Sequence, residues 1–328
     1  TIGRAPPETC HVPNSTSNPG TPQARELQIT LRTTLSAALK PSTSSMYEHH
    51  WASFTSFKKS VLSDNSFPAS PNAVALFIIH LGNKKLAIRT IRTYLSAISY
   101  IHKINNKPDP TSTFVVAKTL QGLQNQQTQN TRPPLQPITR DILYQLLDNI
   151  PICSRTPYDV IMWSAIFQLC YHGCLRAGEA VISASSQHTI QLHQLAVTQS
   201  NITIQFSSYK HSGKDTPSVT IQADHNQARC PVRALQAYLH LRPRCDGPLF
   251  IDSNSVPISR ILLSSFLKSV LVQAKHNPDL FNTHSFRIGR TTQLAQDNHS
   301  QETIRSAGRW KSSAYIQYIR TNNIQMPP

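Results

Sequence analysis

A segment rich in amides and prolines, residues 125–137, divides this chain of 328 residues into two parts. It reads NQQTQNTRPPLQP and has no apolar periodicity, a composition that is typical of a linker between domains. The chain is long enough for two domains that each bury a hydrophobic core. We therefore expect one domain over residues 25–124 and a second over residues 138–328. Residues 1–24 are rich in Pro, Ser, Thr and Asn and are predicted to form a flexible arm.

The first of these parts, residues 25–124, has the apolar spacing of a helical domain. An aromatic stripe lies at helical intervals between Tyr47 and Phe57, and a second apolar face runs through residues 88–102. We expect both stripes to form the core of a small helical bundle. Four basic residues lie off the second face: Lys84, Lys85, Arg89 and Arg92. They fit either an ordinary solvated surface or a set of contacts to DNA phosphates.

The second part mixes two kinds of periodicity. A long apolar stretch, residues 159–171, predicts a buried helix. Residues 201–223 instead alternate apolar and polar side chains, with Ile202 and Ile204 on one side of the segment YKHSGKD and Val219 and Ile221 on the other. This period of two predicts a β-hairpin. The fold class that we expect is therefore mainly α with a small β-sheet.

The charge of the chain indicates a polyanionic partner. Lys and Arg number 32 against 16 Asp and Glu, which gives a net charge of +16. Residues 1–137 hold 14 basic and 5 acidic residues, and the remainder holds 18 and 11. A solvated surface needs no such excess, so we expect DNA as the partner. Because both parts are basic, a clamp with DNA between the two domains is favoured over a single basic tail.

Several other classes of protein are disfavoured. No run of about 18 apolar residues occurs, so no membrane span is expected, and no apolar signal-peptide core stands at the start. The six cysteines are scattered through a long chain, which fits a reducing compartment rather than a disulfide scaffold. Cys170 and Cys174 have no second pair at ligand spacing, so we predict no metal site.

Residues 282–320 gather the side chains that carry chemistry. His284 and Arg287 are spaced i, i+3, so a helix would present both on one face. Trp310 lies two residues after Gly308, and Tyr315 and Tyr318 come after it, again spaced i, i+3. Each residue alone is more often a surface or core residue. Together they supply a cationic anion clamp, a proton-transfer group and a phenol, which is what nucleophilic attack on a phosphodiester requires.

These motifs resemble those of the tyrosine recombinase, or phage-integrase-like, family. The sequence His284-Ser285-Phe286-Arg287 is similar to the H-x-x-R box of that family, and Trp310 resembles its His/Trp position. The segments HSFRIG and GRWKSSAYIQYIR are most similar to those of recombinases from eukaryotic mobile elements of the Crypton and DIRS/Ngaro types. The resemblance runs from about residue 27 to the end of the chain. It implies a helical core-binding domain and a mixed α/β catalytic domain that together clamp DNA.

The resemblance also implies roles for individual residues. Arg176 matches the first catalytic arginine of an L-R-x-x-E motif, in which Glu179 would be a buried, orienting carboxylate. Lys210 matches the hairpin lysine, with Lys214 as the alternative. Tyr318 matches the nucleophile, although it follows Trp310 by eight residues where the family usually has nine. The reserve candidate for the nucleophile is Tyr315.

In the implied mechanism, Arg176 and Arg287 hold the non-bridging oxygens of the scissile phosphate. His284 takes the proton of Tyr318, and Lys210 protonates the departing 5′ oxygen. Trp310 donates its indole N–H to a phosphate oxygen, because it cannot transfer a proton. The product is a 3′-phosphotyrosine link that another strand can resolve with no cofactor. Two features depart from the pattern: Arg290, where a small residue is usual, and a chain end only ten residues past Tyr318.

The family resemblance further implies double-stranded DNA and other copies of the chain as partners, as a dimer on one site and a tetramer on two. For a eukaryotic mobile element the protein would act in the nucleus, and otherwise inside the cell, in integration or excision of the element. Two other interpretations stay open. One is an inactive DNA-binding protein that a host has adopted, and the other is a type IB topoisomerase, which shares the chemistry.

Overall fold

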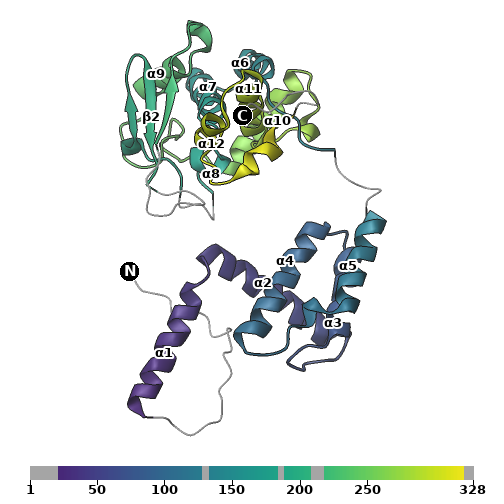
Figure 1. The fold of residues 1–328 in the computed structure, drawn as a ribbon. Helices are drawn as coiled ribbons and strands as arrows, with labels where there is room; N and C mark the ends of the chain where they lie inside the picture. The colour runs from purple at the N-terminus through teal and green to yellow at the C-terminus, as the bar shows by residue number, and fades with distance from the viewer. Residues whose placement is uncertain (1–20, 128–132, 184–187, 208–217, 321–328) are drawn as a thin grey trace. The chain divides into compact units, whose positions relative to one another are not determined.

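The computed structural model describes residues 21–127, 133–183, 188–207 and 218–320. The chain forms two compact units, which are separated in the sequence between Arg132 and Pro133. The first unit is helical, and the second combines helices with a small antiparallel sheet (Figure 1). The predicted fold class, mainly α with a small β-sheet, is therefore confirmed. No helix among the described residues is long and apolar enough to span a bilayer.

The first unit is built from α1 (Pro22–Ala37), α2 (Pro41–Val61), α3 (Pro71–Asn83), α4 (Ile88–Ile104), the short 3-10 helix η1 (Pro110–Ser112) and α5 (Phe114–Gln127). A proline opens each of the first three helices, where its missing N–H leaves no bond unmade. Because α1 begins at Pro22, it takes in the last residues of the segment that the sequence predicts to be a flexible arm.

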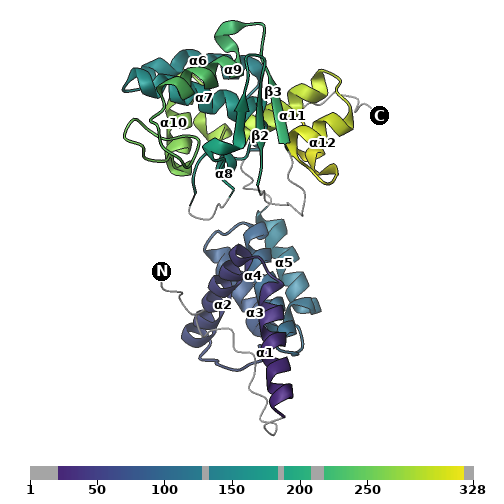
Figure 2. The same ribbon diagram turned by 90° about the vertical axis from the view of Figure 1, so that its left-hand side faces the viewer.

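The predicted apolar stripes form the core of the first unit. Helix α2 packs against α4, and α3 packs against α5 (Figure 2). Phe54, Phe77 and Ile91 are at most 1 % exposed, and they meet in this core. Between α3 and α4 the chain turns sharply at Lys85, whose φ of 59° lies in the left-handed region. This turn and the start of α4 carry the basic residues Lys84 and Arg89 on the surface.

The second unit has ten further elements that bear on the site: α6 (Arg140–Cys153), α7 (Pro157–His172), α8 (Ala177–Ala180), β1 (Leu195–Val197), β2 (Asn201–Gln205), β3 (Ser218–Gln222), α9 (Pro231–Leu241), α10 (Arg260–Gln273), α11 (Ser285–Gln296) and α12 (Gln301–Gly308). The 3-10 helix η6 (Ser313–Tyr318) follows them. The sheet has the order β1-β2-β3 and is antiparallel throughout. Ile204 pairs with Val219 and Ile202 with Ile221, so the two strands of the predicted hairpin do pair.

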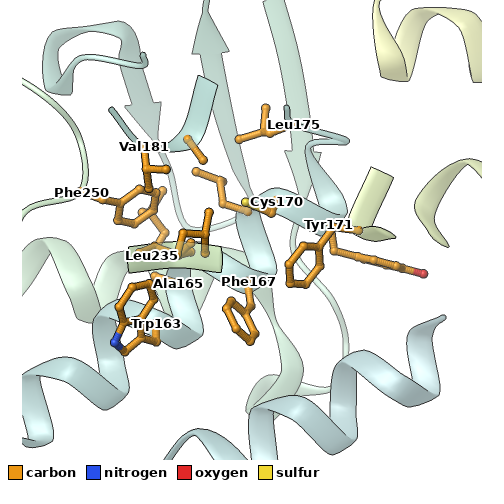
Figure 3. Close-up of a cluster of buried hydrophobic side chains, with 14 of the residues drawn as sticks. Trp163, Ala165, Phe167, Cys170, Tyr171, Leu175, Val181, Leu235 and Phe250 are labelled. Atoms are coloured by element: carbon orange, nitrogen blue, oxygen red, sulfur yellow. The ribbon is translucent and has the colours of Figure 1, made fainter. Parts of the chain in front are cut away.

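Helix α7 is the centre of the second unit. It is apolar on all sides and is enclosed by α6, α9 and α11 (Figure 1). Trp163, Phe167 and Tyr171 of this helix are at most 4 % exposed and belong to the buried cluster in Figure 3. A Thr156–Asp159 capping box fixes the start of the helix. The predicted buried helix over residues 159–171 is therefore present, and α7 extends beyond it to Pro157 at its start and to His172 at its end.

Helix α11, which carries the H-x-x-R motif, is held in place by a close approach at Gly289. A Cβ atom on Gly289 would lie 1.7 Å from the carbonyl oxygen of Ile138, so only glycine fits. One turn earlier, the Ile138 N–H donates to the Ser285 carbonyl at 3.0 Å. The start of the second unit is thus fixed against the first two turns of α11, where His284 and Arg287 lie.

Candidate functional site

Arg287 has the largest fully buried side chain in the part of the chain that the structure describes, with 0 % exposure. Its Nη1 donates to the carbonyl of Cys174 at 2.6 Å, and its Nη2 donates to the carbonyl of Gly308. The guanidinium carbon lies 4.0 Å from the centroid of the Trp310 ring and 5.6 Å from that of Tyr318. Burial lowers the pKa of Arg287, but an arginine stays charged at neutral pH. A buried cation is therefore enclosed by carbonyls on one side and by aromatic rings on the other.

Arg176 lies next to this cation, on the turn that ends α7. Helix α7 closes at Gly173, Cys174 adopts a left-handed φ of 47°, and Arg176 caps the short helix α8. The charge of Arg176 is close enough to Arg287 to contribute to the lowered pKa of that group. Two guanidinium groups that are more than a hundred positions apart in the sequence are thus neighbours. The structure brings together the two arginines on which the sequence hypothesis depends.

Glu179 is buried, with 2 % exposure, and bonds to both sides of the turn. Its Oε1 accepts from Arg176 Nη1 at 2.7 Å, and its Oε2 accepts from the Arg176 backbone N–H at 2.8 Å. The same Oε2 accepts from Arg309 Nη2 at 2.6 Å. Burial opposes ionisation of this carboxyl, but the charges of Arg309 and Arg176 outweigh it, so the pKa of Glu179 is lowered. The carboxylate is thus ionised between two arginines.

His284 caps the start of α11, and its ring lies beside Tyr318. The centroids of these two rings are 5.0 Å apart, and the Trp310 ring is also 5.0 Å from that of Tyr318. Burial, followed by the charges of Arg287 and Arg176, lowers the pKa of His284 to about 4. The imidazole is therefore neutral at pH 7 and can accept a proton.

The two tyrosines of η6 have different surroundings. Tyr315 is 1 % exposed, and its hydroxyl donates to Gln301 Oε1 at 2.8 Å. Tyr318 is half-buried, and the hydrogen bond from the Thr292 hydroxyl reaches its backbone carbonyl rather than its phenol. Tyr315 therefore has a structural partner for its oxygen, whereas the phenol of Tyr318 lies among His284, Trp310 and Arg287.

Several predicted site residues are not part of this cluster. Lys210 and Lys214 lie outside the described residues, between β2 and β3. The four basic residues of the first unit, Lys84, Lys85, Arg89 and Arg92, are exposed at the end of α3 and on α4. Arg92 Nη2 donates to Gln124 Oε1 at 3.1 Å, which links α4 to α5. Among the described residues, no group of three or more His, Cys, Asp or Glu could hold a metal ion.

Three further arginines, which are not among the predicted site residues, lie in or near this cluster. Arg309 is buried against Glu179, as described above. Arg260, at the start of α10, and Arg320, after η6, are exposed, and both contribute to the lowered pKa of His284. The cluster therefore lies in a field of positive charge, which favours an anionic ligand. Arg320 ends the family-like segment GRWKSSAYIQYIR, whereas Arg260 is identified only by its position near His284.

The fold is that of the tyrosine recombinases, or phage integrases. The Tn1549 transposon integrase in complex with transposon right end DNA is similar over 92 % of this chain and 95 % of its own, with a TM-score of 0.62 and 14 % identity. The XerH site-specific recombinase bound to a palindromic difH substrate gives a TM-score of 0.61 and 14 % identity over 86 % and 76 % of the two chains. A lambda integrase dimer bound to a COC′ core site gives 0.57 and 12 % identity over 92 % and 79 %. The sequence itself matches no protein-family profile and no curated protein.

Proposed function

We propose that this protein is a site-specific DNA recombinase that cleaves and rejoins DNA through a 3′-phosphotyrosine intermediate. The observation that carries the proposal is the convergence of a phenol, a neutral imidazole and two arginines, Tyr318, His284, Arg287 and Arg176, in a fold shared with DNA recombinases. No one of these features would suffice, because folds of this kind can be kept after an activity is lost.

Attack on DNA begins with the phenol of Tyr318. A free phenol has a pKa near about 10, so it needs a base at neutral pH. His284 lies beside the ring and is neutral, so it accepts the proton as the phenolic oxygen bonds to phosphorus. The bond from phosphorus to the 5′ oxygen then breaks, and Lys210 protonates the departing oxygen. A phosphate between Arg176 and Arg287 offsets the charge that lowers the pKa of His284, so substrate binding itself makes the imidazole a better base.

The two arginines stabilise the transition state. Charge accumulates on the non-bridging oxygens as the pentavalent phosphorus forms, and two fixed cations neutralise it there. Arg287 makes two hydrogen bonds to carbonyls, so N–H groups of its fork remain for the phosphate. Because the group is fully buried beneath Trp310 and Tyr318, DNA has to displace part of this aromatic cover before the guanidinium meets the phosphate.

The proposed biological role and the DNA partner rest on the sequences of the motifs and on the net charge of the chain. The sequence HSFRIG at the start of α11 supports a recombinase of the Crypton or DIRS/Ngaro type, which integrates or excises a mobile element in the nucleus. The basic residues of the first unit support contacts to DNA phosphates, and the net charge of +16 supports DNA as the partner. On one site the protein acts as a dimer and on two sites as a tetramer, as strand exchange between two duplexes needs four cuts.

A suicide substrate tests the proposal. A duplex that carries a candidate element end and a nick beside the cleavage site loses a short strand on cleavage, so the covalent protein–DNA adduct accumulates. The wild-type protein is expected to form the adduct, Tyr318→Phe to form none, and Tyr315→Phe to retain it. Loss of the adduct only in Tyr315→Phe would assign the nucleophile to the other phenol. Relaxation of plasmids that lack the site would indicate a topoisomerase, and binding without any adduct would indicate a DNA-binding protein.

A further inference from the structure

We infer that Arg309 is a positioning residue for DNA cleavage: it holds Glu179 so that Arg176 keeps free N–H groups, and it directs Trp310 over Arg287. This inference rests on the proposed function. Arg309 itself contacts neither the phosphate nor the nucleophile, so its effect on the reaction passes through Arg176 and Trp310.

The side chain of Arg309 is enclosed on every side, with 2 % exposure. Its Nη2 donates to Glu179 Oε2 at 2.6 Å and to the Cys174 carbonyl at 3.4 Å, and its Nη1 donates to the Gly173 carbonyl at 3.3 Å. The guanidinium carbon lies 4.5 Å from the centroid of Phe206, just after β2. One side chain thus joins the turn after α7, the carboxylate of α8 and the end of a strand.

Because two arginines share Glu179, the carboxylate determines which N–H groups of Arg176 are left to bind a phosphate. An arginine beside a free carboxylate tends to bind both oxygens at once with its planar fork. Here Oε2 accepts from Arg309 and from the backbone N–H of Arg176, so among the described residues the Arg176 guanidinium bonds Glu179 through Nη1 alone. The remaining N–H groups of Arg176, whose side chain is 21 % exposed, stay available for a phosphate. Without Arg309, only the backbone N–H of Arg176 would hold Oε2, and Glu179 could exchange that bond for a bidentate contact to the Arg176 guanidinium.

The backbone of Arg309 sets the position of Trp310. Arg309 ends α12 with φ 56° and ψ 45°, a left-handed conformation that favours Gly or Asn. This turn folds the Trp310 ring back over Gly308, where a Cβ atom would lie 1.7 Å from the ring. The same ring covers Arg287 at 4.0 Å. Because arginine is unfavourable in this conformation, its buried contacts to Glu179 supply a physical reason for its presence there.

The alternative is that the ion pair between Arg309 and Glu179 only stabilises the fold. Substrates that differ in charge at the scissile phosphate distinguish this alternative from a positioning role. If Arg309 acts through Arg176, its loss weakens neutralisation of a non-bridging oxygen. A methylphosphonate at the scissile position replaces one such oxygen with a neutral methyl group, so the reaction no longer needs that cation. A folding defect would impair cleavage of both substrates alike.

The experiment compares adduct formation on a phosphate suicide substrate and on its two methylphosphonate diastereomers. Wild type, Arg176→Ala, Arg309→Met and the double variant are assayed, with thermal unfolding and DNA affinity measured for each. On the phosphate substrate, Arg309→Met is expected to lower the rate by about 10- to 100-fold, the usual effect of losing a partner that orients an active group. The diastereomer that restores adduct formation by Arg176→Ala should also restore adduct formation by Arg309→Met. The double variant should form the adduct no more slowly than Arg176→Ala.

Three outcomes decide the matter. Equal loss on phosphate and methylphosphonate, or additive losses in the double variant, would overturn the inference while wild-type cleavage upheld the proposed function. An inactive wild type would instead overturn the proposed function, and this inference with it. If Arg309→Met does not fold, Arg309→Lys keeps the charge but lacks the fork, and it should show the same selective rescue at a smaller loss.

Discussion

The guanidinium carbon of Arg287 lies 4.0 Å from the centroid of the Trp310 ring, closer than the 5.6 Å that separates it from the centroid of Tyr318. The contact is a cation–π interaction with a fully buried guanidinium, and such interactions are strongest where the cation is desolvated. It joins the end of α12 to the first turn of α11. The position of the Trp310 ring, together with that of Tyr318, therefore determines how far the buried cation is covered.

The Trp310 position depends on Gly308, and this leads to a first prediction. In Gly308→Ala the added Cβ would lie 1.7 Å from the Trp310 ring, so the ring has to move off Arg287. Overpacking of this kind costs about 1–3 kcal/mol of unfolding free energy, and adduct formation should fall with it. Gly122→Ala on α5 is the matched control, because its Cβ would meet nothing within 4 Å. Urea unfolding and the suicide-substrate assay measure both effects, and equal behaviour of the two variants would contradict the prediction.

A second prediction concerns acid and His172, a half-buried histidine at the end of α7 whose Nε2 atom is buried. Burial, followed by the charge of Arg290, lowers the pKa of His172 to about 3. As the pH falls below about 6.5, the unfolded chain takes up the proton first, which stabilises the unfolded state. The stabilising contribution of the neutral imidazole is therefore complete above pH 6.5 and is lost as the pH falls. At 1.36 kcal/mol per pKa unit, His172 alone should lower the unfolding free energy by about 2 kcal/mol between pH 7 and pH 5.

The measurement for His172 needs a signal from the second unit alone. Of the three tryptophans, Trp51 lies in the first unit, so a Trp51→Phe background leaves a fluorescence signal from Trp163 and Trp310. In that background His172→Gln should flatten the fall in stability between pH 7 and pH 5, whereas His225→Gln, at an exposed position, should not. Histidine 284, whose pKa is lowered to about 4, acts in the same direction and leaves a residual slope in both variants. An unchanged slope in His172→Gln would contradict the assignment.

The sequence predicts those parts of the fold that depend on local order. The period of two over residues 201–223 identifies β2 and β3, and the apolar run of residues 159–171 identifies α7. Strand β1 has three residues, which is too short for any periodicity, so only its pairing with Ile204 reveals it. In the site, the i, i+3 spacing places His284 and Arg287 at the start of one helix. The same spacing does not distinguish Tyr315 from Tyr318, because their difference lies in the contact of Tyr315 with Gln301.

Long-range contacts explain what the sequence leaves out. The burial of both arginines depends on contacts between distant parts of the chain. Arg287 bonds to Cys174, 113 positions earlier, and Arg309 bonds to Glu179, 130 positions earlier. No pattern in residues 305–311 distinguishes Arg309 from an exposed cation such as Lys311. Whether a charged side chain is buried depends on the element that packs against it. A single sequence identifies such a position only where a known motif marks it, as at Arg176.

The last prediction concerns the basic face of the first unit, defined as Lys84, Lys85, Arg89 and Arg92. All four side chains are exposed, and among the described residues none of them forms an ion pair with a carboxylate. If they contact DNA phosphates, each contact releases counterions and contributes about 0.9 to the slope of log affinity against log salt concentration. A variant that lacks all four should therefore lose about 3–4 units of slope. Lys85 is replaced by Asn, which tolerates its φ of 59°, and the others by Ala.

The control for this face removes the same charge elsewhere in the first unit, at four other exposed residues: Arg25, Lys59, Lys107 and Lys118. General attraction between a basic protein and DNA would weaken binding equally in both variants, because both lose four positive charges. Direct contacts would reduce the slope chiefly in the variant of the basic face. Binding is measured by fluorescence anisotropy over a series of salt concentrations, since affinity at a single concentration cannot separate the two effects. Equal slopes in the two variants would show that the face is an ordinary solvated surface.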